Sequence, residues 1–395
     1  MTHYNIPSMH NNIEPNMITI STNTNTASFI SKTLQKYLIT IKEQIDKYSA
    51  KWDNFKKYTN PYEYIHSVVP SAKTPVCKHK PLSRSYFKMI EMLHMLDIAK
   101  DYEDNSSINT FHLAEGPGGF IEAIVEVRDN LSDKYYGMTL INDIDENVPG
   151  WRKSRDFLSR NGNVKIISGA DGTGDLLNSD NLMYCYKEFA NKMDIITGDG
   201  GFDFSIDFNK QETLATNLIF SQICFAITMQ KHGGTFIIKI FDVFNKSTVD
   251  LIYILNCLYE KIYITKPHTS RYANSERYIV CRGFKLVDST PFLNRFLQIY
   301  KNNDLNKPIT NFLNIDYSYY FINKLEEINA ILGQYQIENI NSTINLIITK
   351  QNTDKLEMIK KNNIQKCINW CNKYKQPCNK TFIQTNNFVS QHSDP

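Results

Sequence analysis

Short apolar runs alternate with helical patterns between residues 110 and 284, and this alternation limits the chain to few folds. The runs typical of buried strands lie at 110–114, 135–141, 164–168, 193–199, 234–241, 261–265 and 277–284. Apolar residues at helical spacing fill several gaps, notably 211–231 and 246–258. The pattern predicts an α/β fold with a doubly wound, mostly parallel sheet of seven strands and helices on both faces. In such sheets, ligands bind outside the carboxyl ends of the strands.

The segments on either side of this region predict extensions to the domain. Residues 1–25 are rich in Asn, Thr and His with little apolar periodicity, so we expect a flexible arm. Residues 26–72 carry apolar positions at helical spacing among lysines, and residues 291–380 are helical in pattern and rich in Asn, Ile and Tyr. We therefore predict one α/β domain at 73–290 between helical extensions, and a disordered tail at 381–395.

Composition and charge argue against a secreted or membrane protein and leave other classes open. The chain has 395 residues, and its formal net charge of +3 neither requires nor rules out a nucleic-acid partner. Eight scattered cysteines suit free thiols in a reducing compartment. No signal-peptide pattern and no membrane-length apolar run is present, so we expect a soluble intracellular protein. Cys367, Cys371 and Cys378 lack the spacing of common zinc ligands, and no metal site is expected.

Lys239 is an anomaly, because it lies in the middle of the apolar run 234–241. Burial lowers the pKa of an ammonium group and a nearby carboxylate raises it, so this lysine is either paired with acids or poised for proton chemistry. Asp199 and Glu276 each lie at the boundary of another strand-like run. We predict that the three side chains meet in one cleft. The alternative is a buried ion pair with a purely structural role.

A glycine-rich turn, AEGPGGF at 114–120, joins the first strand to a helix. Gly116, Gly118 and Gly119 allow a tight turn, and a ligand could come close to the backbone and to the free N–H groups of the helix start. The spacing matches neither a GxGxxG fingerprint nor a P-loop. Taken alone, such a turn can also serve only to pack the helix against the sheet.

Acidic residues follow the next two strands. Asp143 and Asp145 follow the second, near the usual position of a ribose in this fold class. Asp171 and Asp175 follow the third, where a carboxylate could accept from an exocyclic amine or a hydroxyl. These acids are candidates for binding a nucleoside cofactor. The alternative is that they cap helices or turns.

A basic loop precedes the first helix of the domain. It carries Lys73, Lys78, Lys80 and Arg84 and runs into a helical pattern that contains Lys88. Such loops are usually only solvated, but this one leads to a helix near the predicted site. Contact with a phosphate backbone is therefore an equal alternative.

Five motifs occur in order along the domain: HLAEGPGGF, ADGTGDL, ITGDGGFDFS, GGTFIIKIF and SRYANSERYIVCRGFK. Together they resemble the FtsJ/RrmJ-like family of S-adenosylmethionine-dependent RNA ribose 2′-O-methyltransferases. The similarity is strongest to the mRNA cap methyltransferases, including those of large cytoplasmic DNA viruses. The resemblance covers roughly residues 73–285 and implies a Rossmann-like fold.

The resemblance also implies the residues of the site. The implied catalytic tetrad is Lys88, Asp199, Lys239 and Glu276, each matched by its motif. The implied contacts to S-adenosylmethionine, the expected cofactor, are Glu115, Gly116, Pro117, Gly118, Gly119, Phe120, Asp143, Asp171 and Asp199. The RNA contacts that we expect are Lys78, Lys80, Arg84 and Arg271.

The sequence departs from the family pattern at three places. Glu115 stands where bacterial members usually have a small residue, and GDGG replaces the more usual DGS after the aspartate. His112 stands where an acid is common at the end of the first strand. This last difference leaves open which acid holds the methionine part of the cofactor.

By resemblance, the expected reaction is methyl transfer to a ribose 2′-hydroxyl, with the capped 5′ end of mRNA as the substrate. Alternatives are methylation of ribosomal or transfer RNA, and a non-catalytic RNA-binding or scaffolding subunit, which the intact tetrad disfavours. Lys239 would act as a base with its pKa lowered by Lys88, or charged lysines would stabilise the developing alkoxide, and both roles stay open.

We expect RNA, most of all capped mRNA, as the partner. Other capping or transcription proteins are further candidate partners, and no membrane is expected. The expected location is the cytoplasm, which for a viral protein means the host cytoplasm or the virion.

Overall fold

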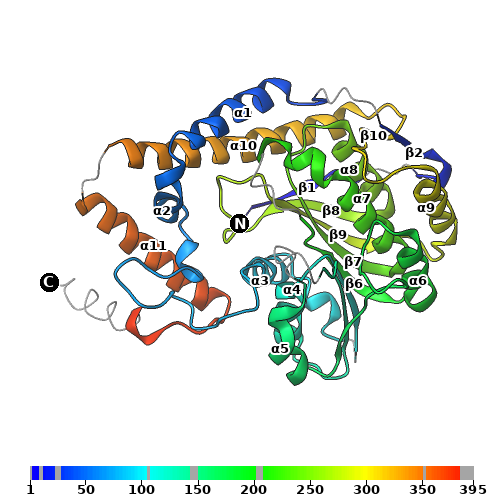
Figure 1. Cartoon of the computed structure of the whole chain (residues 1–395), viewed down its shortest axis with the longest axis horizontal. Helices are drawn as coiled ribbons and strands as arrows, with labels where there is room; N and C mark the ends of the chain where they lie inside the picture. Colours follow the sequence, from blue (N-terminus) through cyan, green and yellow to red (C-terminus); the bar gives the residue numbers. More distant parts are fainter. Residues whose placement is uncertain are drawn as a thin grey trace.

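The computed structural model describes residues 2–8, 12–22, 28–104, 107–142, 150–201, 208–349 and 353–382. An eight-stranded sheet forms its centre, in the order β1-β8-β9-β7-β6-β3-β4-β5 (Figure 1). The strands are β1 (Thr2–Ile6), β3 (Asn109–Leu113), β4 (Lys134–Met138), β5 (Val164–Ile166), β6 (Met193–Gly198), β7 (Gln230–Ile240), β8 (Tyr259–Lys266) and β9 (Arg277–Phe284). The seven predicted strands are all present and the prediction of a mostly parallel α/β sheet is confirmed, while β1 adds an eighth strand at one edge.

Helices cover both faces of this sheet. They are α3 (Ser85–Met95), α4 (Gly119–Arg128), α5 (Arg155–Arg160), α6 (Ser179–Phe189), α7 (Gln211–Met229), α8 (Lys246–Leu258) and α9 (Thr290–Asn302). Ile195 and Ile237 pack on the side of α3 and α4, whereas their neighbours Ile196 and Ile238 pack on the side of α7 and α8. Because both faces are covered, the central strands read as continuous apolar runs, and every residue of β6 is buried.

The strand order places a switch point between β3 and β6. From β3 the chain builds β4 and β5 on one side and then returns to build β6 and β7 on the other. Leu113 at the end of β3 is in register with Gly198 at the end of β6, and Gly198 is in register with Ile238 of β7. The carboxyl ends of these parallel strands therefore form one edge, the place at which this fold class binds ligands.

The N-terminal residues differ from the flexible arm that we expected. Residues 2–6 pair antiparallel with β8, and β2 (Ile18–Ser21) pairs with β10 (Asn311–Leu313) in a second, two-stranded sheet. Ile6 and Ile18 are buried. Strands of four or five residues carry too few positions to show a period, so the sequence pattern does not reveal them.

The two extensions pack together at one side of the domain (Figure 1). The helices α1 (Lys32–Asp46) and α2 (Ser49–Thr59) lie along the long helix α10 (Tyr319–Ile348). The last helix, α11 (Thr353–Lys373), packs on the domain near α3. In addition, Leu38 of α1 and Ile337 of α10 pack against Phe244, which follows β7. The extensions are thus joined to the edge of the sheet at which the parallel strands end.

Short 3-10 helices occur at η1 (Pro15–Met17), η2 (Glu63–Ile65), η3 (Lys100–Tyr102), η4 (Arg152–Ser154) and η5 (Phe208–Lys210). Among the described helices, none is both long enough and apolar enough to cross a membrane. Of the tail predicted to be disordered, residues 383–395 lie outside the described residues.

Candidate active site

Four side chains from separate elements meet at the carboxyl edge of the sheet. Lys88 lies on α3, Asp199 directly follows β6, Lys239 is near the end of β7 and Glu276 directly precedes β9. The Nζ of Lys88 lies 2.7 Å from both carboxylate oxygens of Glu276. The Nζ of Lys239 lies 3.2 Å from Asp199 Oδ1 and donates to the Asp199 carbonyl oxygen at 2.6 Å. The structure therefore brings together all four residues of the predicted tetrad.

Tyr278 links the two ion pairs, and sequence reasoning missed it. Its hydroxyl donates to Asp199 Oδ1 at 2.9 Å, and Lys88 Nζ lies 3.4 Å from the hydroxyl oxygen of Tyr278. Tyr278 in β9 is the register partner of Lys239 in β7, so the two side chains lie on one face of the sheet. A signal was available, because Tyr278 stands two residues after Glu276 and side chains alternate along a strand.

The charges of the tetrad act on the pKa values of Glu276 and Lys88. Burial raises the pKa of Glu276, but the ammonium groups of Lys88 and Lys239 outweigh burial and hold this pKa well below its usual range. Burial lowers the pKa of Lys88, while Glu276 and Asp199 act in the opposite direction. Of the two lysines, Lys239 is the more exposed, with 13% of its side chain accessible against 5% for Lys88. Lys239 is therefore the lysine of the tetrad that an incoming hydroxyl group can reach more easily.

The loop between β8 and β9, which carries Glu276, is fixed by further buried contacts. Glu91 on α3 is fully buried and accepts the backbone N–H groups of His268 and Thr269, both at 2.8 Å. Ser270 Oγ donates to Glu276 Oε1 at 2.7 Å. Glu91 was not predicted, although an acid three residues after Lys88 on an apolar helix is a visible signal.

Lys266 holds the same loop from its other end. Its Nζ donates to the carbonyl oxygen of Asn274 at 2.8 Å, to Asn274 Oδ1 at 2.9 Å and to the carbonyl oxygen of Glu276 at 2.6 Å. Burial lowers the pKa of Lys266 to about 7. The three acceptors match the three donors of an ammonium group, so Lys266 positions the backbone of Glu276.

The glycine-rich turn lies between β3 and α4, beside the tetrad. The carboxylate of Glu115 accepts the N–H of Phe120 and, at 3.3 Å, that of Ile121, and so caps the start of α4. The other oxygen of Glu115, Oε2, is buried. It lies 3.2 Å from His112 Nδ1, but burial lowers the pKa of His112 to about 3, and this nitrogen is 2.7 Å from Thr197 Oγ1. His112 is thus a neutral histidine inside the sheet.

The glycines of this turn are required by close packing. A Cβ atom on Gly116 would collide with the carbonyl oxygen of Gly150, and one on Gly119 would collide with the hydroxyls of Ser83 and Ser85. Gly118 has a φ of 103°, which disfavours a side chain. The turn therefore brings the loop after β4 and the start of α3 against the edge of the sheet.

The predicted acids after β4 and β5 have different outcomes. Asp143 and Asp145 lie outside the described residues. Asp171 is exposed and accepts from Thr173 and from the side-chain amides of Asn178 and Asn181, which hold its pKa at about 2 against partial desolvation. Asp171 therefore orders a turn, which is the alternative role that the sequence allowed for this acid. A contact from Asp171 to a cofactor stays a prediction.

The predicted RNA contacts are of two kinds. Lys78 and Lys80 are exposed, and Arg84 at the start of α3 is partly exposed and near enough to Glu276 that its charge helps to lower the pKa of that acid. Arg271 instead pairs with Glu63 of η2, with Nε at 2.9 Å and Nη2 at 2.6 Å from its carboxylate. Burial raises the pKa of Glu63, but Arg271 brings it down to about 2. Arg271 thus anchors the β8–β9 loop, and RNA contact from it stays a prediction.

Residues 81–284, just over half of the chain, match the family model described as FtsJ-like methyltransferase. The chain belongs to the FtsJ-like methyltransferase family. The resemblance seen in the motifs is thereby confirmed, and a methyl donor is implied. In this member of the family, the described residues that could hold the donor are the glycine-rich turn and the loop around Asp171.

Several relatives of this FtsJ-like chain carry names that state their activity. The chain is 32% identical over 249 residues to cap-specific mRNA (nucleoside-2′-O-)-methyltransferase 1 of Mus musculus, covering 58% of this chain and 28% of that protein. It is 26% identical over 279 residues to cap-specific mRNA (nucleoside-2′-O-)-methyltransferase 2 of Drosophila melanogaster, covering 68% and 39%. It is 34% identical over 192 residues to the type 1 protein of Trypanosoma cruzi, covering 47% and 50%. The alignments thus span half or less of each relative. A solved ribosomal RNA methyltransferase of Plasmodium falciparum is similar at 21% identity and a TM-score of 0.36, over 51% of this chain and 98% of that one.

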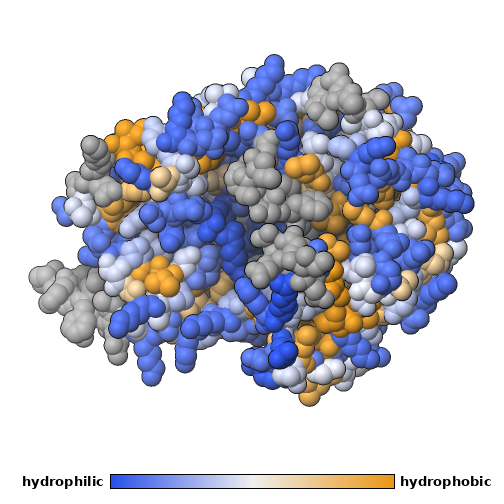
Figure 2. All heavy atoms as spheres, in the orientation of Figure 1, coloured by the Kyte–Doolittle hydropathy of each residue, from blue (hydrophilic) through white to orange (hydrophobic). Residues whose placement is uncertain are grey.

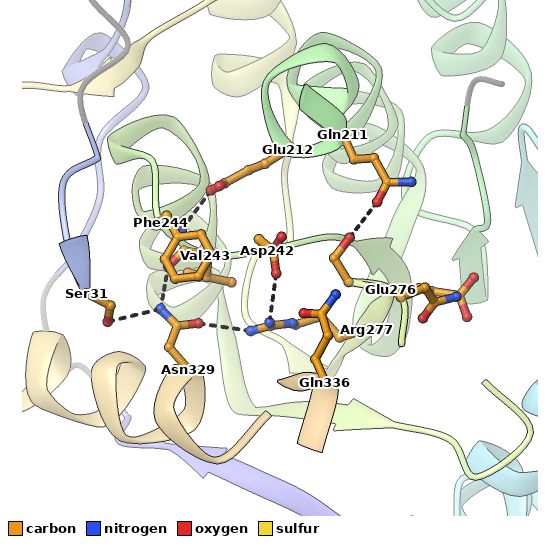
Figure 3. A network of polar contacts seen from close by, with 12 residues as sticks. Ser31, Gln211, Glu212, Asp242, Val243, Phe244, Glu276, Arg277, Asn329 and Gln336 are labelled. Atoms are coloured by element: carbon orange, nitrogen blue, oxygen red, sulfur yellow. Dashed lines mark hydrogen bonds and ion pairs between the residues drawn. The ribbon is translucent and has the colours of Figure 1, made fainter. Parts of the chain in front are cut away.

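A buried polar network ties the extensions of this FtsJ-like chain to Glu276 (Figure 3). Nη2 of Arg277 lies 3.2 Å from Asp242 Oδ1, and Nη1 of the same side chain donates to Asn329 Oδ1 at 2.9 Å. The amide of Asn329, on α10, donates to the carbonyl oxygen of Val243 at 2.5 Å. From α1, Lys42 Nζ lies 3.1 Å from Asp242 Oδ2. Two helices of the extensions therefore hold the residue next to Glu276.

The segment before Glu276 is held from two further sides. Gln336 of α10 donates to the carbonyl oxygen of Ala273 at 2.8 Å, and Ser275 donates to Gln211 of α7 at 2.6 Å. Figure 3 shows the side chains of Gln336, on α10, and Gln211, on α7, pointing toward this segment. The position of Glu276 thus depends on α10, which lies outside the family match.

Asn329→Ala is expected to lower the free energy of unfolding by about 2 to 4 kcal/mol, because it leaves a donor of Arg277 and the carbonyl oxygen of Val243 buried without partners. Urea unfolding followed by circular dichroism measures the change. The control is Asn323→Ala on the exposed side of the same helix, expected to change stability by less than about 0.5 kcal/mol. Equal stability of the two variants would show that the network does not support the fold.

Proposed function

We propose that this protein transfers a methyl group from S-adenosylmethionine to a ribose 2′-hydroxyl at the capped 5′ end of mRNA. The observation that carries the proposal is the meeting of Lys88, Asp199, Lys239 and Glu276 beside the glycine-rich turn at one edge of the sheet. The choice of substrate is supported by the relatives named as cap-specific mRNA methyltransferases.

The chemistry of the turn suits such a cofactor. Burial, with repulsion from Asp199, raises the pKa of Glu115 well above its usual range, and Glu115 caps the start of α4 from inside the sheet. Gly118, with a φ of 103°, turns the backbone at the same place, so a cofactor can approach it closely. The residues that would hold the cofactor are Glu115, Gly116, Pro117, Gly118, Gly119, Phe120 and Asp171, with Asp143 outside the described part. When bound, S-adenosylmethionine supplies a methyl group activated on a sulfonium.

The tetrad prepares the sugar hydroxyl as the nucleophile. Lys239 is the reachable cation, and its contacts with Asp199 hold the ammonium group at the edge of the sheet. From there the nitrogen of Lys239 can take the proton of the 2′-hydroxyl when it is a neutral amine, or stabilise the developing oxyanion when it is an ammonium group, and both roles require the same position. Lys88 and Glu276 form a second ion pair behind it. Alignment of the hydroxyl with the methyl group adds to the rate, because it removes the entropic cost of bringing the groups together.

Two other functions follow from the same fold. Methylation of ribosomal or transfer RNA would use the same tetrad but would not require a cap. A non-catalytic RNA-binding subunit would not need the tetrad, and the complete geometry of the tetrad argues against this function.

The same proposal includes a location and further partners. We propose that the protein acts in the cytoplasm, which for a viral protein means the host cytoplasm or the virion. We also propose that it contacts other capping or transcription proteins. The cysteines are free thiols, which suits a reducing compartment.

The test is incubation of the purified full chain with isotope-labelled S-adenosylmethionine and matched capped and uncapped RNAs, followed by nuclease mapping of the label. We expect label on a 2′-oxygen next to the cap in the capped RNA and little in the uncapped RNA. Equal labelling of both RNAs would favour the ribosomal or transfer RNA alternative. No labelling, together with no cofactor binding by calorimetry, would favour the non-catalytic subunit.

A further inference from the structure

Three thiols from distant parts of the chain meet where the segment after α11 lies beside the basic loop that precedes α3. Cys77 is in this loop, Cys371 is near the end of α11, and Cys378 follows the helix. The side chain of Cys371 is in hydrogen-bond contact with those of both Cys77 and Cys378. The sequence spacing did not group them, because Cys77 lies far from the other two along the chain.

The backbone determines how Cys77 and Cys378 face each other. The two residues form an isolated antiparallel bridge. Two backbone hydrogen bonds flank the bridge, one from the N–H of Lys78 to the carbonyl oxygen of Pro377 at 2.7 Å and one from the N–H of Asn379 to that of Val76 at 2.9 Å. Cys77 and Cys378 are thus a non-hydrogen-bonded pair, a position at which Cα atoms are typically about 4.5 Å apart. A disulfide needs Cα atoms about 4.4 to 6.8 Å apart, so this bridge can accept one without moving the backbone.

The three thiols differ in exposure and in acidity. Cys378 is partly exposed, whereas Cys77 and Cys371 are fully buried. A hydrogen bond from Cys371 lowers the pKa of Cys77, and the backbone N–H of His79 acts in the same direction, against burial. Figure 2 shows mostly hydrophilic residues along the lower edge of the molecule, where Figure 1 places the segment after α11. A small polar oxidant can therefore reach Cys378, while Cys77 is the thiol that reacts as a thiolate.

We propose that Cys77 and Cys378 form a disulfide when the protein meets hydrogen peroxide, and that this bond clamps the segment after α11 onto the basic loop. The peroxide oxidises the thiol of Cys378 to a sulfenic acid and releases one water. The thiolate of Cys77 then attacks the sulfur of Cys378, so that the S–S bond forms and the S–O bond breaks. The leaving hydroxide takes the proton that Cys77 lost and becomes a second water. The two thiols together lose two electrons, and the peroxide gains them.

The clamp acts on the attachment of the last helix to the domain. In the reduced protein, α11 is held there by packing of buried side chains such as Trp370 against Phe87 of α3. A disulfide from Cys77 to Cys378 closes a long loop and stabilises the folded state, chiefly because it restricts the unfolded chain. A thiol reductant opens the bond again. Disulfides of this reversible kind are the ones expected where thiols are otherwise kept reduced, and the inference does not depend on the proposed function.

The test treats the reduced full chain with hydrogen peroxide under native conditions, blocks the remaining thiols and identifies cross-linked peptides by mass spectrometry. We expect a cross-link between Cys77 and Cys378 that dithiothreitol removes. The oxidised protein should have a Tm about 5 °C higher than the reduced protein. Both effects should be absent in Cys378→Ser. The matched control is Cys257→Ser, in the core on the other face of the sheet, which should form the cross-link like the parent.

A further variant tests the part played by the third thiol. Cys371→Ala should slow formation of the disulfide by about threefold or more, because the thiolate of Cys77 loses a hydrogen-bond donor. An unchanged rate would overturn this role of Cys371.

The outcomes in the parent protein decide the proposal. A peroxide-treated native protein that contains no disulfide, or in which Cys371 replaces Cys77 or Cys378 in the cross-link, overturns the proposed pair. A cross-link between Cys77 and Cys378 that leaves the Tm unchanged overturns the clamp. A reversible cross-link with the higher Tm, lost in Cys378→Ser and kept in Cys257→Ser, supports both.

Discussion

Lys239→Met is expected to lower the rate of methyl transfer to capped RNA by about 100- to 1000-fold. Methionine keeps the length and apolar stem of the side chain but removes the cation that faces the substrate hydroxyl. The loss follows in both roles, because the neutral amine that would take the proton and the ammonium group that would stabilise the oxyanion use the same nitrogen, held 3.2 Å from Asp199 Oδ1. Single-turnover rates at saturating RNA and S-adenosylmethionine measure the chemical step.

The control for this prediction lies on the same strand. Lys231 is exposed at the other end of β7, where its Nζ lies 2.9 Å from Asp194 Oδ1. Lys231→Met should leave the rate within about twofold of the parent, since it lies away from the edge where ligands bind. Cofactor affinity should also be retained in Lys239→Met. A Lys239→Met protein that reacts as fast as the parent would remove the tetrad from the mechanism.

Glu276→Gln is expected to abolish activity and to lower the free energy of unfolding by about 3 to 5 kcal/mol. The amide leaves the ammonium group of Lys88 buried without the negative charge that now lies 2.7 Å away. Lys88 has Tyr278 at 3.4 Å as a remaining neighbour, which is too weak a contact to replace a carboxylate. Urea unfolding gives the stability, and the methyl-transfer assay gives the activity.

The double variant Lys88→Met/Glu276→Gln tests whether charge is the cause. Removing both charges should restore much of the stability lost in Glu276→Gln, because no unpaired ion is left buried, while activity stays absent. Glu327→Gln, which breaks an exposed pair with Lys324, serves as the control and should change stability by less than about 1 kcal/mol. If the double variant were no more stable than Glu276→Gln, the loss would come from packing and not from an unpaired charge.

The sequence alone predicted the central part of the fold correctly. The strands from β3 to β9 are recognisable because both faces of the sheet are covered, which requires continuous apolar runs such as residues 234–241. The same rule drew attention to Lys239, because a charged residue is not expected in a strand that is buried on both faces. Asp199 follows β6 and Glu276 precedes β9. Because β9 runs antiparallel to β7, the start of β9 lies at the same edge as the ends of the parallel strands β6 and β7. The motifs then added Lys88, which lies on a helix and follows from no strand rule.

What the sequence could not predict are the partners of residues far apart along the chain. Arg271 looked like a free basic residue, yet it pairs with Glu63, 208 positions away. Residues 2–6 looked like a flexible arm, yet they add a strand beside β8. Asn339 and Tyr335 stood in a plain helical pattern, and only the approach of α2 and the β8–β9 loop makes them the walls of a cavity. The sequence by itself determined which segments are buried and which motifs they carry, because hydrophobic periodicity is local. The tertiary structure decided which charges pair and where a cavity remains, because both depend on contacts between segments that no local pattern records.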